Sequence, residues 1–173
     1  MFSGNKIWTL ACLFVLMACT PARDWREVSP EGGGIQALFP CRPQHHMRSM
    51  GLPQVVAPMH LLVCHSGEQT FALGYLDVAA PGDVASALVA LRNAAKANMR
   101  AVDSAAVPLR IAGMTPNQDA ALVSMKGLTP EGTTLKAQMG FFAKGLRVYQ
   151  ATVYGADLGE EVLETFFSGL KLP

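Results

Sequence analysis

Apolar and polar side chains alternate from Thr133 to Gly155, which is the pattern of two neighbouring β-strands. Lys144-Gly145 interrupts this alternation and indicates a tight turn, because glycine accepts a positive φ. After residue 157 the apolar residues recur at helical spacing instead, which is typical of an amphipathic helix. The C-terminal part of the chain is therefore expected to form a hairpin with one helix packed across it.

A longer helix is predicted over residues 83–102, where apolar residues also recur at helical spacing. Pro81-Gly82 ends the strand pattern before it, and Asp83 is expected to cap the helix N-terminus with its side chain. Asp157 is expected to cap the last helix in the same way, with Glu160 completing a capping box. Both helices thus have predicted starting points.

The rest of the chain consists of short apolar or alternating segments separated by turns that are rich in proline and glycine. Turns of hairpin length join antiparallel strands. We therefore expect an α+β fold, in which a mostly antiparallel sheet of about six to seven strands packs with two main helices as an α/β/α sandwich. The predicted strands before the C-terminal hairpin are residues 25–29, 35–39, 46–50, 55–65, 69–78, 106–111 and 119–126.

The N-terminal residues are predicted to be a targeting segment. Residues 1–18 carry one charge, at Lys6, followed by an apolar run that is too short to span a membrane comfortably. The run ends in Leu16-Met17-Ala18-Cys19, which resembles the lipobox of bacterial lipoproteins. The resemblance implies cleavage before Cys19 and lipidation of its thiol. An uncleaved signal anchor and an ordinary signal peptide are the alternatives.

A lipobox implies that the chain lies at the bacterial cell envelope, on the periplasmic face, with a lipid as its membrane contact. Thr20 follows the cysteine in place of aspartate, which resembles the outer-membrane pattern of enterobacterial lipoproteins. Residues 19–24 are then a short lipidated tether, and residues 25–173 form a single domain without an internal repeat. We therefore expect a protein that is anchored to the membrane by its N-terminal lipid.

Charge limits the partners that this domain can bind. The chain has 14 basic and 13 acidic residues, and Lys6 lies in the leader, so the remaining charges balance. A nucleic-acid-binding surface needs a net basic patch, and the charge balance does not indicate one. No nucleic-acid partner is expected.

Two cysteines remain after the leader and the lipobox are set aside. They are Cys41 and Cys64, and an even pair in an oxidising compartment is most simply a disulfide. A redox or metal-binding thiol pair is the alternative, but such pairs usually occur as Cys-x-x-Cys, and these two are 23 residues apart. We expect a structural disulfide between them.

Four stretches of the domain together carry a family resemblance. They are IQALFPCRP (35–43), FALGYLDV (71–78), GLRVYQATVYG (145–155) and EEVLETFFSGLKL (160–172). They resemble the PsbP-like and Mog-like α/β/α sandwich superfamily, which includes small bacterial lipoproteins. Known relatives are mostly accessory proteins that dock on larger complexes, namely an extrinsic photosystem subunit and a GTPase-binding factor. The resemblance implies the fold and an accessory role, and it transfers no functional residue.

No local sequence motif indicates an enzymatic reaction. The chain lacks Gly-x-Ser-x-Gly, His-Glu-x-x-His, a phosphate-binding glycine loop and Cys-x-x-Cys. A hydrolase assembled from distant serine, histidine and aspartate residues stays open, but no trio is favoured. We expect a protein that is not an enzyme and has no cofactor.

The four histidines all lie within residues 45–65, where methionines also gather. Imidazole and thioether groups suit copper, and imidazole alone suits zinc. His45, His46, Met47 and His60 are therefore candidate metal ligands. Against a shared site, His60 and His65 have opposite strand parity, which places their side chains on opposite faces. Adjacent histidines are typical of an exposed loop, and methionine is commonly core filler.

Two functions from different classes follow. The leading hypothesis is a lipid-anchored periplasmic accessory protein that docks on a protein partner in the cell envelope. The alternative is a periplasmic carrier of copper, zinc or a small ligand that uses the segment from 45 to 65. Tyr149 and Tyr154 have opposite parity, so an outward-facing tyrosine can anchor a partner, although ordinary sheet side chains explain both residues as well.

Overall fold

The computed structural model describes residues 23–51, 55, 58–101, 103–129 and 131–173. The predicted leader, the predicted lipidation site Cys19 and most of the predicted tether lie outside the described residues. Within the described part, no helix is both long enough and apolar enough to cross a membrane.

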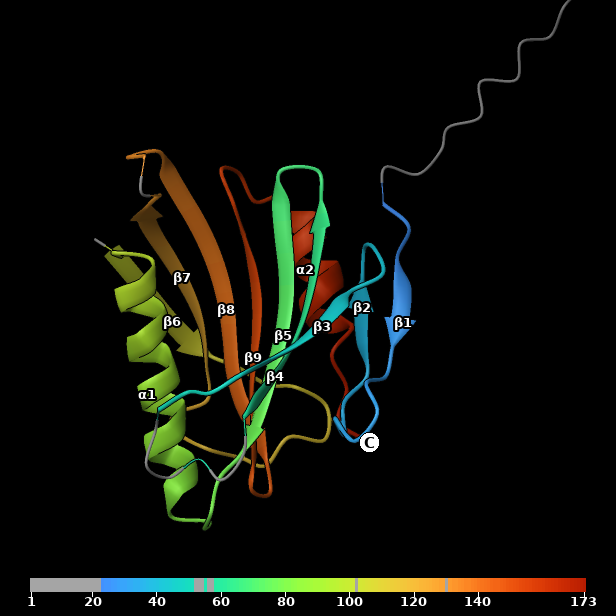
Figure 1. The fold of residues 1–173 in the computed structure, drawn as a ribbon, viewed down its shortest axis with the longest axis vertical. Coiled ribbons are helices and arrows are strands. Elements are labelled where there is room, and N and C mark those ends of the chain that lie inside the picture. Colours follow the sequence, from blue (N-terminus) through green and yellow to red (C-terminus); the bar gives the residue numbers. More distant parts are fainter. Residues whose placement is uncertain (1–22, 52–54, 56–57, 102, 130) are drawn as a thin grey trace, which may run out of the picture.

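Among the described residues, seven strands form one antiparallel sheet in the spatial order β3-β4-β5-β9-β8-β7-β6 (Figure 1). A hairpin of β1 and β2 forms a second, two-stranded sheet beside it, and two helices complete the α+β fold that the sequence predicts. The elements are β1 (Arg26–Val28), β2 (Ala37–Phe39), β3 (Gln44–Arg48), β4 (Met59–Ser66), β5 (Gln69–Asp77), α1 (Asp83–Asn98), β6 (Asp103–Pro108), β7 (Ala121–Leu128), β8 (Thr134–Lys144), β9 (Arg147–Gly155) and α2 (Glu160–Ser168).

The two helices lie on opposite faces of the large sheet (Figure 1). Each face therefore has its own apolar core. On one face, Phe166 of α2 packs edge-on against Phe39 and Phe71, with ring centroids 5.6 and 5.5 Å apart. On the other face, Leu88 and Leu91 of α1 belong to a separate buried cluster with side chains of the sheet. A single sheet with both faces covered accounts for the apolar content of its central strands.

The predicted helix caps are wrong. Gly82 and Gly159 occupy the two N-cap positions, and neither helix has a side-chain cap. Asp83 is the first residue of α1, where its carboxylate accepts a hydrogen bond from the backbone N–H of Ala80 at 3.1 Å. Asp157 instead forms an ion pair at 2.8 Å with a lysine of β8. Helix α1 also ends at Asn98, before the predicted end at residue 102.

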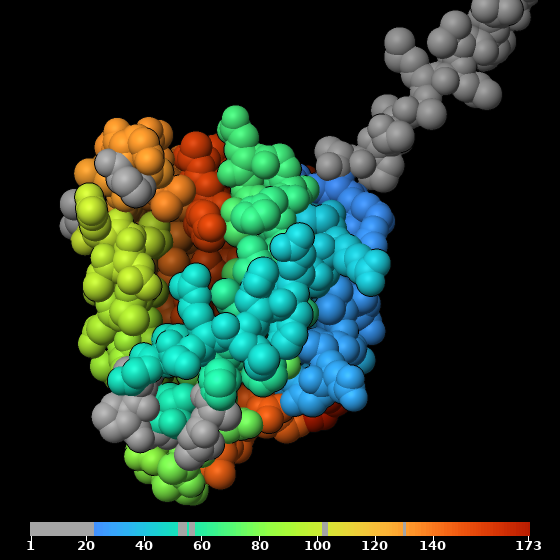
Figure 2. Space-filling model, in the orientation of Figure 1, coloured from blue at the N-terminus to red at the C-terminus, as the bar shows by residue number. Residues whose placement is uncertain are grey.

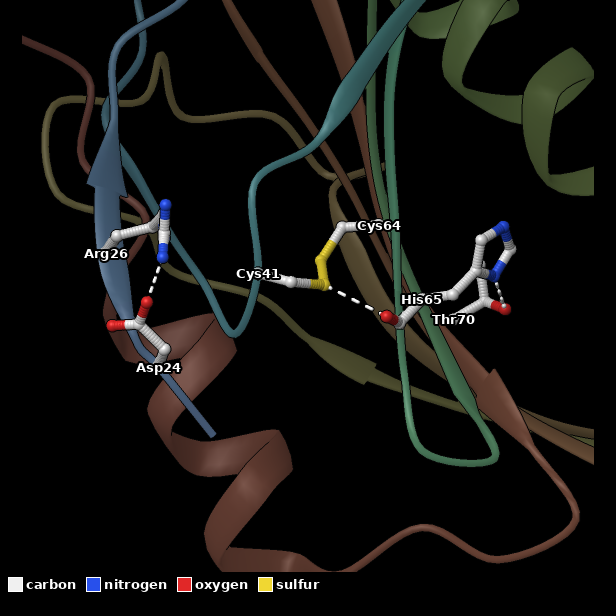
Figure 3. The surroundings of a disulfide bond; sticks show 6 residues. All are labelled: Asp24, Arg26, Cys41, Cys64, His65 and Thr70. Carbon is white, nitrogen blue, oxygen red and sulfur yellow. Dashed lines mark hydrogen bonds and ion pairs between the residues drawn. A yellow bond between two sulfur atoms is a disulfide. The ribbon is translucent and has the colours of Figure 1, made fainter. Parts of the chain in front are cut away.

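The predicted disulfide is present between Cys41 and Cys64, with their Cα atoms 6.0 Å apart (Figure 3). Cys41 lies between β2 and β3, and Cys64 lies in β4. The bond therefore ties the connection between the small and the large sheet to the first long strand of the large sheet. Beside it, the His65 ring Nδ1 contacts the Thr70 hydroxyl of β5 at 2.9 Å.

Candidate functional site

A groove lies on the α1 face of the large sheet, between α1 and the strands β3 and β4. In the space-filling view, side chains of the C-terminal strands are visible at the bottom of this hollow (Figure 2). The groove exists because α1 packs mainly on β8 and β9, which leaves this face of β4 and β5 without a helix of its own. Its volume of about 460 Å³ lies in the range of protein ligand sites, about 300–1,000 Å³.

The floor of the groove carries polar groups among apolar side chains, and Arg48, Asn98 and Thr129 add further polar groups elsewhere in the lining. Gln150 and Thr152 of β9 lie on it, and the Gln150 amide nitrogen lies 3.3 Å from the Thr152 hydroxyl. Tyr154 follows on the same face and is half-buried, so it lies in the groove rather than on an open surface. Tyr149 points to the other face and is 1% exposed, which agrees with the opposite parity of the two tyrosines.

Methionine side chains form much of the groove walls. They are Met50, Met59, Met99 and Met139. Methionine is flexible and polarizable, and it is common on surfaces that bind varied apolar partners. Room for them comes from small residues on β5, since a Cβ atom at Gly74 would lie 2.1 Å from the Met59 methyl carbon.

Arg48 of β3 is the only charged residue among the described residues that line this groove. No acidic side chain takes part in that lining. The arrangement favours an apolar ligand or protein segment that carries a negative charge near the Arg48 end, because opposite charges across an interface are attractive.

A second feature lies on the opposite, α2 face, where a row of side chains crosses five strands. The backbone register pairs Met47 with His60, His60 with Tyr75, Tyr75 with Tyr149, and Tyr149 with Phe142. The His60 ring stacks on the Tyr75 ring with centroids 4.9 Å apart, and Tyr149 stacks on Phe142 at 5.2 Å. The row runs from the buried centre of the sheet to its β3 edge, where Met47 is 66% exposed.

The structure brings together some of the predicted metal ligands. His45 lies two residues before Met47 on β3 and so shares its face, and the His45 Nε2 atom is 3.0 Å from the His60 Nδ1 atom. His46 pairs with Leu61 in the register and therefore lies on the opposite face, so it cannot join the other three at one ion. His65 also lies on the face opposite to His60, as its parity predicts.

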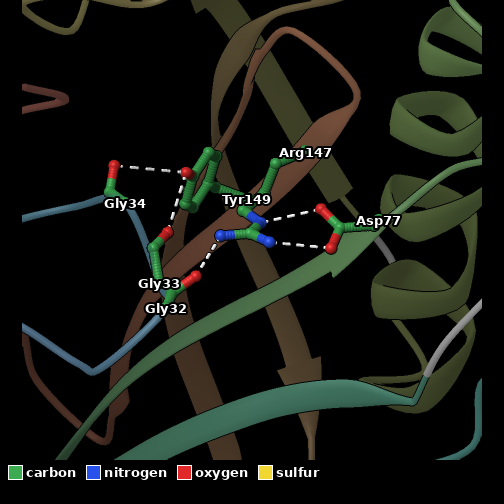
Figure 4. A network of polar contacts seen from close by, with 6 residues as sticks. All are labelled: Gly32, Gly33, Gly34, Asp77, Arg147 and Tyr149. Atoms are coloured by element: carbon green, nitrogen blue, oxygen red, sulfur yellow. Dashed lines mark hydrogen bonds and ion pairs between the residues drawn. The ribbon is translucent and has the colours of Figure 1, made fainter.

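A polar network continues from this row toward the small sheet (Figure 4). Arg147 forms two hydrogen bonds with the Asp77 carboxylate, and its guanidinium lies 5.5 Å from the centre of the Tyr75 ring. The Tyr149 hydroxyl donates to the backbone carbonyl of Gly33 at 2.9 Å. Burial raises the pKa of Tyr149 to about 12, and burial also raises the pKa of Tyr75. Both hydroxyls thus keep their protons at neutral pH, and the network fastens the loop before β2 to the large sheet.

The groove is the feature that sequence reasoning missed. The only signal for it was the opposite parity of Tyr149 and Tyr154, which indicated that one of the two tyrosines faces outward without deciding which. Its lining comes from α1 and from strands β3, β4, β5, β7, β8 and β9, and their approach depends on how far α1 covers the sheet.

Comparison with known proteins gives structural likeness alone. No protein-family model matches the chain, and no curated protein sequence matches it. Similar solved structures include a protein from Bacteroides thetaiotaomicron, with 12% identity, a TM-score of 0.48, and coverage of 84% of this chain and 47% of that one. They also include the cyanobacterial PsbP (CyanoP) from Synechocystis, with 10% identity, a TM-score of 0.45, and coverage of 90% and 96%. This chain spans about half of the Bacteroides protein.

Proposed function

We propose that this chain is a lipid-anchored accessory protein of the bacterial cell envelope, of the PsbP-like type, and that it has no enzymatic activity. The lipobox-like segment that ends at Cys19 supports the anchor. The disulfide between Cys41 and Cys64 supports a location outside the cytoplasm, because disulfides persist in oxidising compartments.

The methionine-lined groove is the observation that carries a binding function. We propose that it receives an amphipathic helix of a protein partner, laid beside α1. A helix with side chains is about 10–12 Å across, whereas strands of a sheet lie about 4.8 Å apart, so one helix cannot cover a seven-stranded face. A second helix from a partner would complete the layer, which is a common mode of recognition.

The positive charge in the groove lining indicates which charge the partner helix carries. Arg48 has no acidic neighbour among the described residues of the groove lining. The partner helix is therefore expected to present apolar side chains to the methionines and an acidic side chain to Arg48.

Site-specific photo-crosslinking in intact cells tests this proposal. Benzoylphenylalanine is placed at Tyr154, inside the groove, and in a control chain at Val107, which is 54% exposed on β6 and does not line the groove. We expect a discrete protein adduct from position 154 and none from position 107, with the crosslinked partner peptide lying in an amphipathic helix. Arg48→Glu should reduce the adduct by about tenfold, whereas Arg48→Lys should leave most of it.

Other outcomes of the same experiment contradict the proposed partner. An adduct with the mass of a lipid or a small molecule would make the groove a small-ligand site instead. Equal adducts from both positions would mean that the groove has no special role. The proposed membrane anchoring is tested separately, since Cys19→Ala should abolish lipid attachment and recovery in the membrane fraction.

A further inference from the structure

The edge of the α2 face at β3 gathers soft and borderline metal donors at the surface. His45 and Met47 lie on the same face of β3, and Met47 is the direct cross-strand partner of His60. Directly opposed residues in an antiparallel pair have Cβ atoms about 5 Å apart, so the side chains of Met47 and His60 start side by side, within reach of a shared ion. The nitrogen atoms of the two imidazoles, 3.0 Å apart, are the closest polar contact there.

The kinds of donor atom at this site limit which metal ion it can bind. Among the described residues, no three histidine, cysteine, aspartate or glutamate side chains converge, so a metal at this pair needs another kind of third ligand. Met47 is the available one, and its 66% exposure leaves its sulfur outside the packed core. Structural zinc sites use four nitrogen, sulfur or oxygen ligands in a tetrahedron, whereas thioether sulfur selects Cu(I).

We propose that His45, Met47 and His60 form a surface site for Cu(I). The site takes two imidazole nitrogens and one thioether sulfur, and it excludes His46, which lies on the other face of the sheet. This inference goes beyond the proposed function and is independent of it, because the groove lies on the α1 face.

The row of stacked side chains behind the site holds one metal ligand, His60, in place before the metal binds. The His60 ring is nearly parallel to the Tyr75 ring, at an interplanar angle of 2°. Tyr75 is 4% exposed and has Arg147 beside its ring, so this platform is fixed in the sheet. Stacking leaves the Nδ1 atom of His60 directed toward His45, and a ligand held in its binding geometry loses less entropy when the metal binds.

Anaerobic competition with a chromophoric Cu(I) chelator tests the site. The full chain is purified in detergent, free thiols are alkylated without reduction, and ascorbate keeps copper as Cu(I) while the disulfide remains intact. We expect one Cu(I) to be withdrawn from the chelator per chain. Loss of even an outer-shell partner costs about 10- to 100-fold in metal affinity, so His45→Ala and His60→Ala should each weaken binding by at least about tenfold.

Matched variants distinguish Cu(I) binding at this site from nonspecific metal binding by the whole segment from 45 to 65. Met47→Leu keeps the size of the side chain but removes the sulfur, so it should weaken Cu(I) binding and leave any Zn(II) binding unchanged. His46→Ala is the control and should bind Cu(I) as the parent does. Equal losses in His46→Ala and His45→Ala, or no transfer of copper to the parent chain, would overturn the proposal. Thermal unfolding of each apo variant shows whether it is folded, and the exposed His45 and Met47 keep the test informative if His60→Ala is unstable.

Discussion

Arg147 of β9 and Asp77 of β5 are direct cross-strand partners and form a two-point ion pair, with Nε 2.7 Å from Oδ1 and Nη2 2.7 Å from Oδ2. The same guanidinium donates a hydrogen bond to the backbone carbonyl of Gly32, in the loop before β2. One side chain therefore fastens the small sheet to the centre of the large one (Figure 4).

Arg147→Ala should lower the free energy of unfolding by about 1.5–3 kcal/mol, the usual range for hydrogen bonds to charged groups. Arg147→Lys should recover less than half of this loss, because lysine cannot form the two-point contact. Arg92, which approaches Asp119 at 3.9 Å at a single point, provides the control, and Arg92→Ala should cost less than about 1 kcal/mol. Urea unfolding measures all three, and equal costs at positions 147 and 92 would contradict the special role of the network.

Tyr149 makes stability depend on alkaline pH. Its pKa in the folded protein is about 12, raised by burial above the ordinary value of 10.0, so the folded state holds this proton more tightly than the unfolded state. The resulting stabilisation is fully present below about pH 10 and is lost as the pH rises through about 12.

Wild-type protein should therefore lose stability between about pH 10 and 12 more steeply than Tyr149→Phe, which has no proton to lose. At neutral pH the variant should be less stable by about 1 kcal/mol, since the hydrogen bond to Gly33 is gone. Urea unfolding across this pH range, with tyrosinate absorbance followed in parallel, provides the measurement. Parallel curves of stability against pH for the two proteins would show that folding does not raise the pKa of the Tyr149 hydroxyl.

Repeating side-chain patterns predicted the elements well where the pattern depends on nearby residues alone. The strand expected over 69–78 is β5, Gln69–Asp77, and the C-terminal hairpin and helix occur as expected. The caps failed because a carboxylate near a helix start has competing partners. Asp157 bonds to Lys136, 21 residues away in the sequence, and no local rule anticipates such a contact.

The sequence predicted on which face of the sheet each candidate side chain lies, but not which side chains of other strands lie beside it. Strand parity correctly separated His60 from His65, because successive side chains alternate across a sheet. The approach of His45 to His60 depends on the register between β3 and β4, and a long connection between two strands does not set that register. The groove depends on which strands α1 covers, a tertiary feature without a local pattern.

The disulfide should make stability sensitive to reduction. A bond that closes a loop of 23 residues restricts the unfolded chain, and in the chain-entropy model this contributes about 3 kcal/mol. Reduction, or replacement by Cys41→Ser with Cys64→Ala, should lower the free energy of unfolding by about this amount. Urea unfolding with and without reductant measures the effect, and the double variant serves as the control that reductant must not destabilise further. An unchanged midpoint in the parent would contradict the prediction.

The C-terminal tail passes so close to Gly113 that only glycine fits there. Gly113 has a φ of +79°, and a Cβ atom at this position would lie 1.9 Å from the backbone oxygen of Leu172. Gly132 has a similar φ of +83° but nothing within 4 Å of such an atom, so it isolates the cost of backbone strain. Gly132→Ala should cost about 1–2 kcal/mol from strain, and Gly113→Ala should cost about 1–3 kcal/mol more from the clash.

The extra cost arises because the tail cannot yield freely. The N–H of Leu172 donates to the carbonyl of Ala112 at 2.9 Å, and Lys171 exchanges backbone hydrogen bonds with Gln36 at 2.8 and 2.9 Å. Moving the tail away from an alanine side chain would break these bonds and expose Leu172, which is 5% exposed in the native state. Urea unfolding gives the difference between the variants, and hydrogen exchange should show faster exchange at Leu172 in Gly113→Ala but not in Gly132→Ala. Equal free energies for the two variants would mean that the tail shifts without cost and does not stabilise the fold.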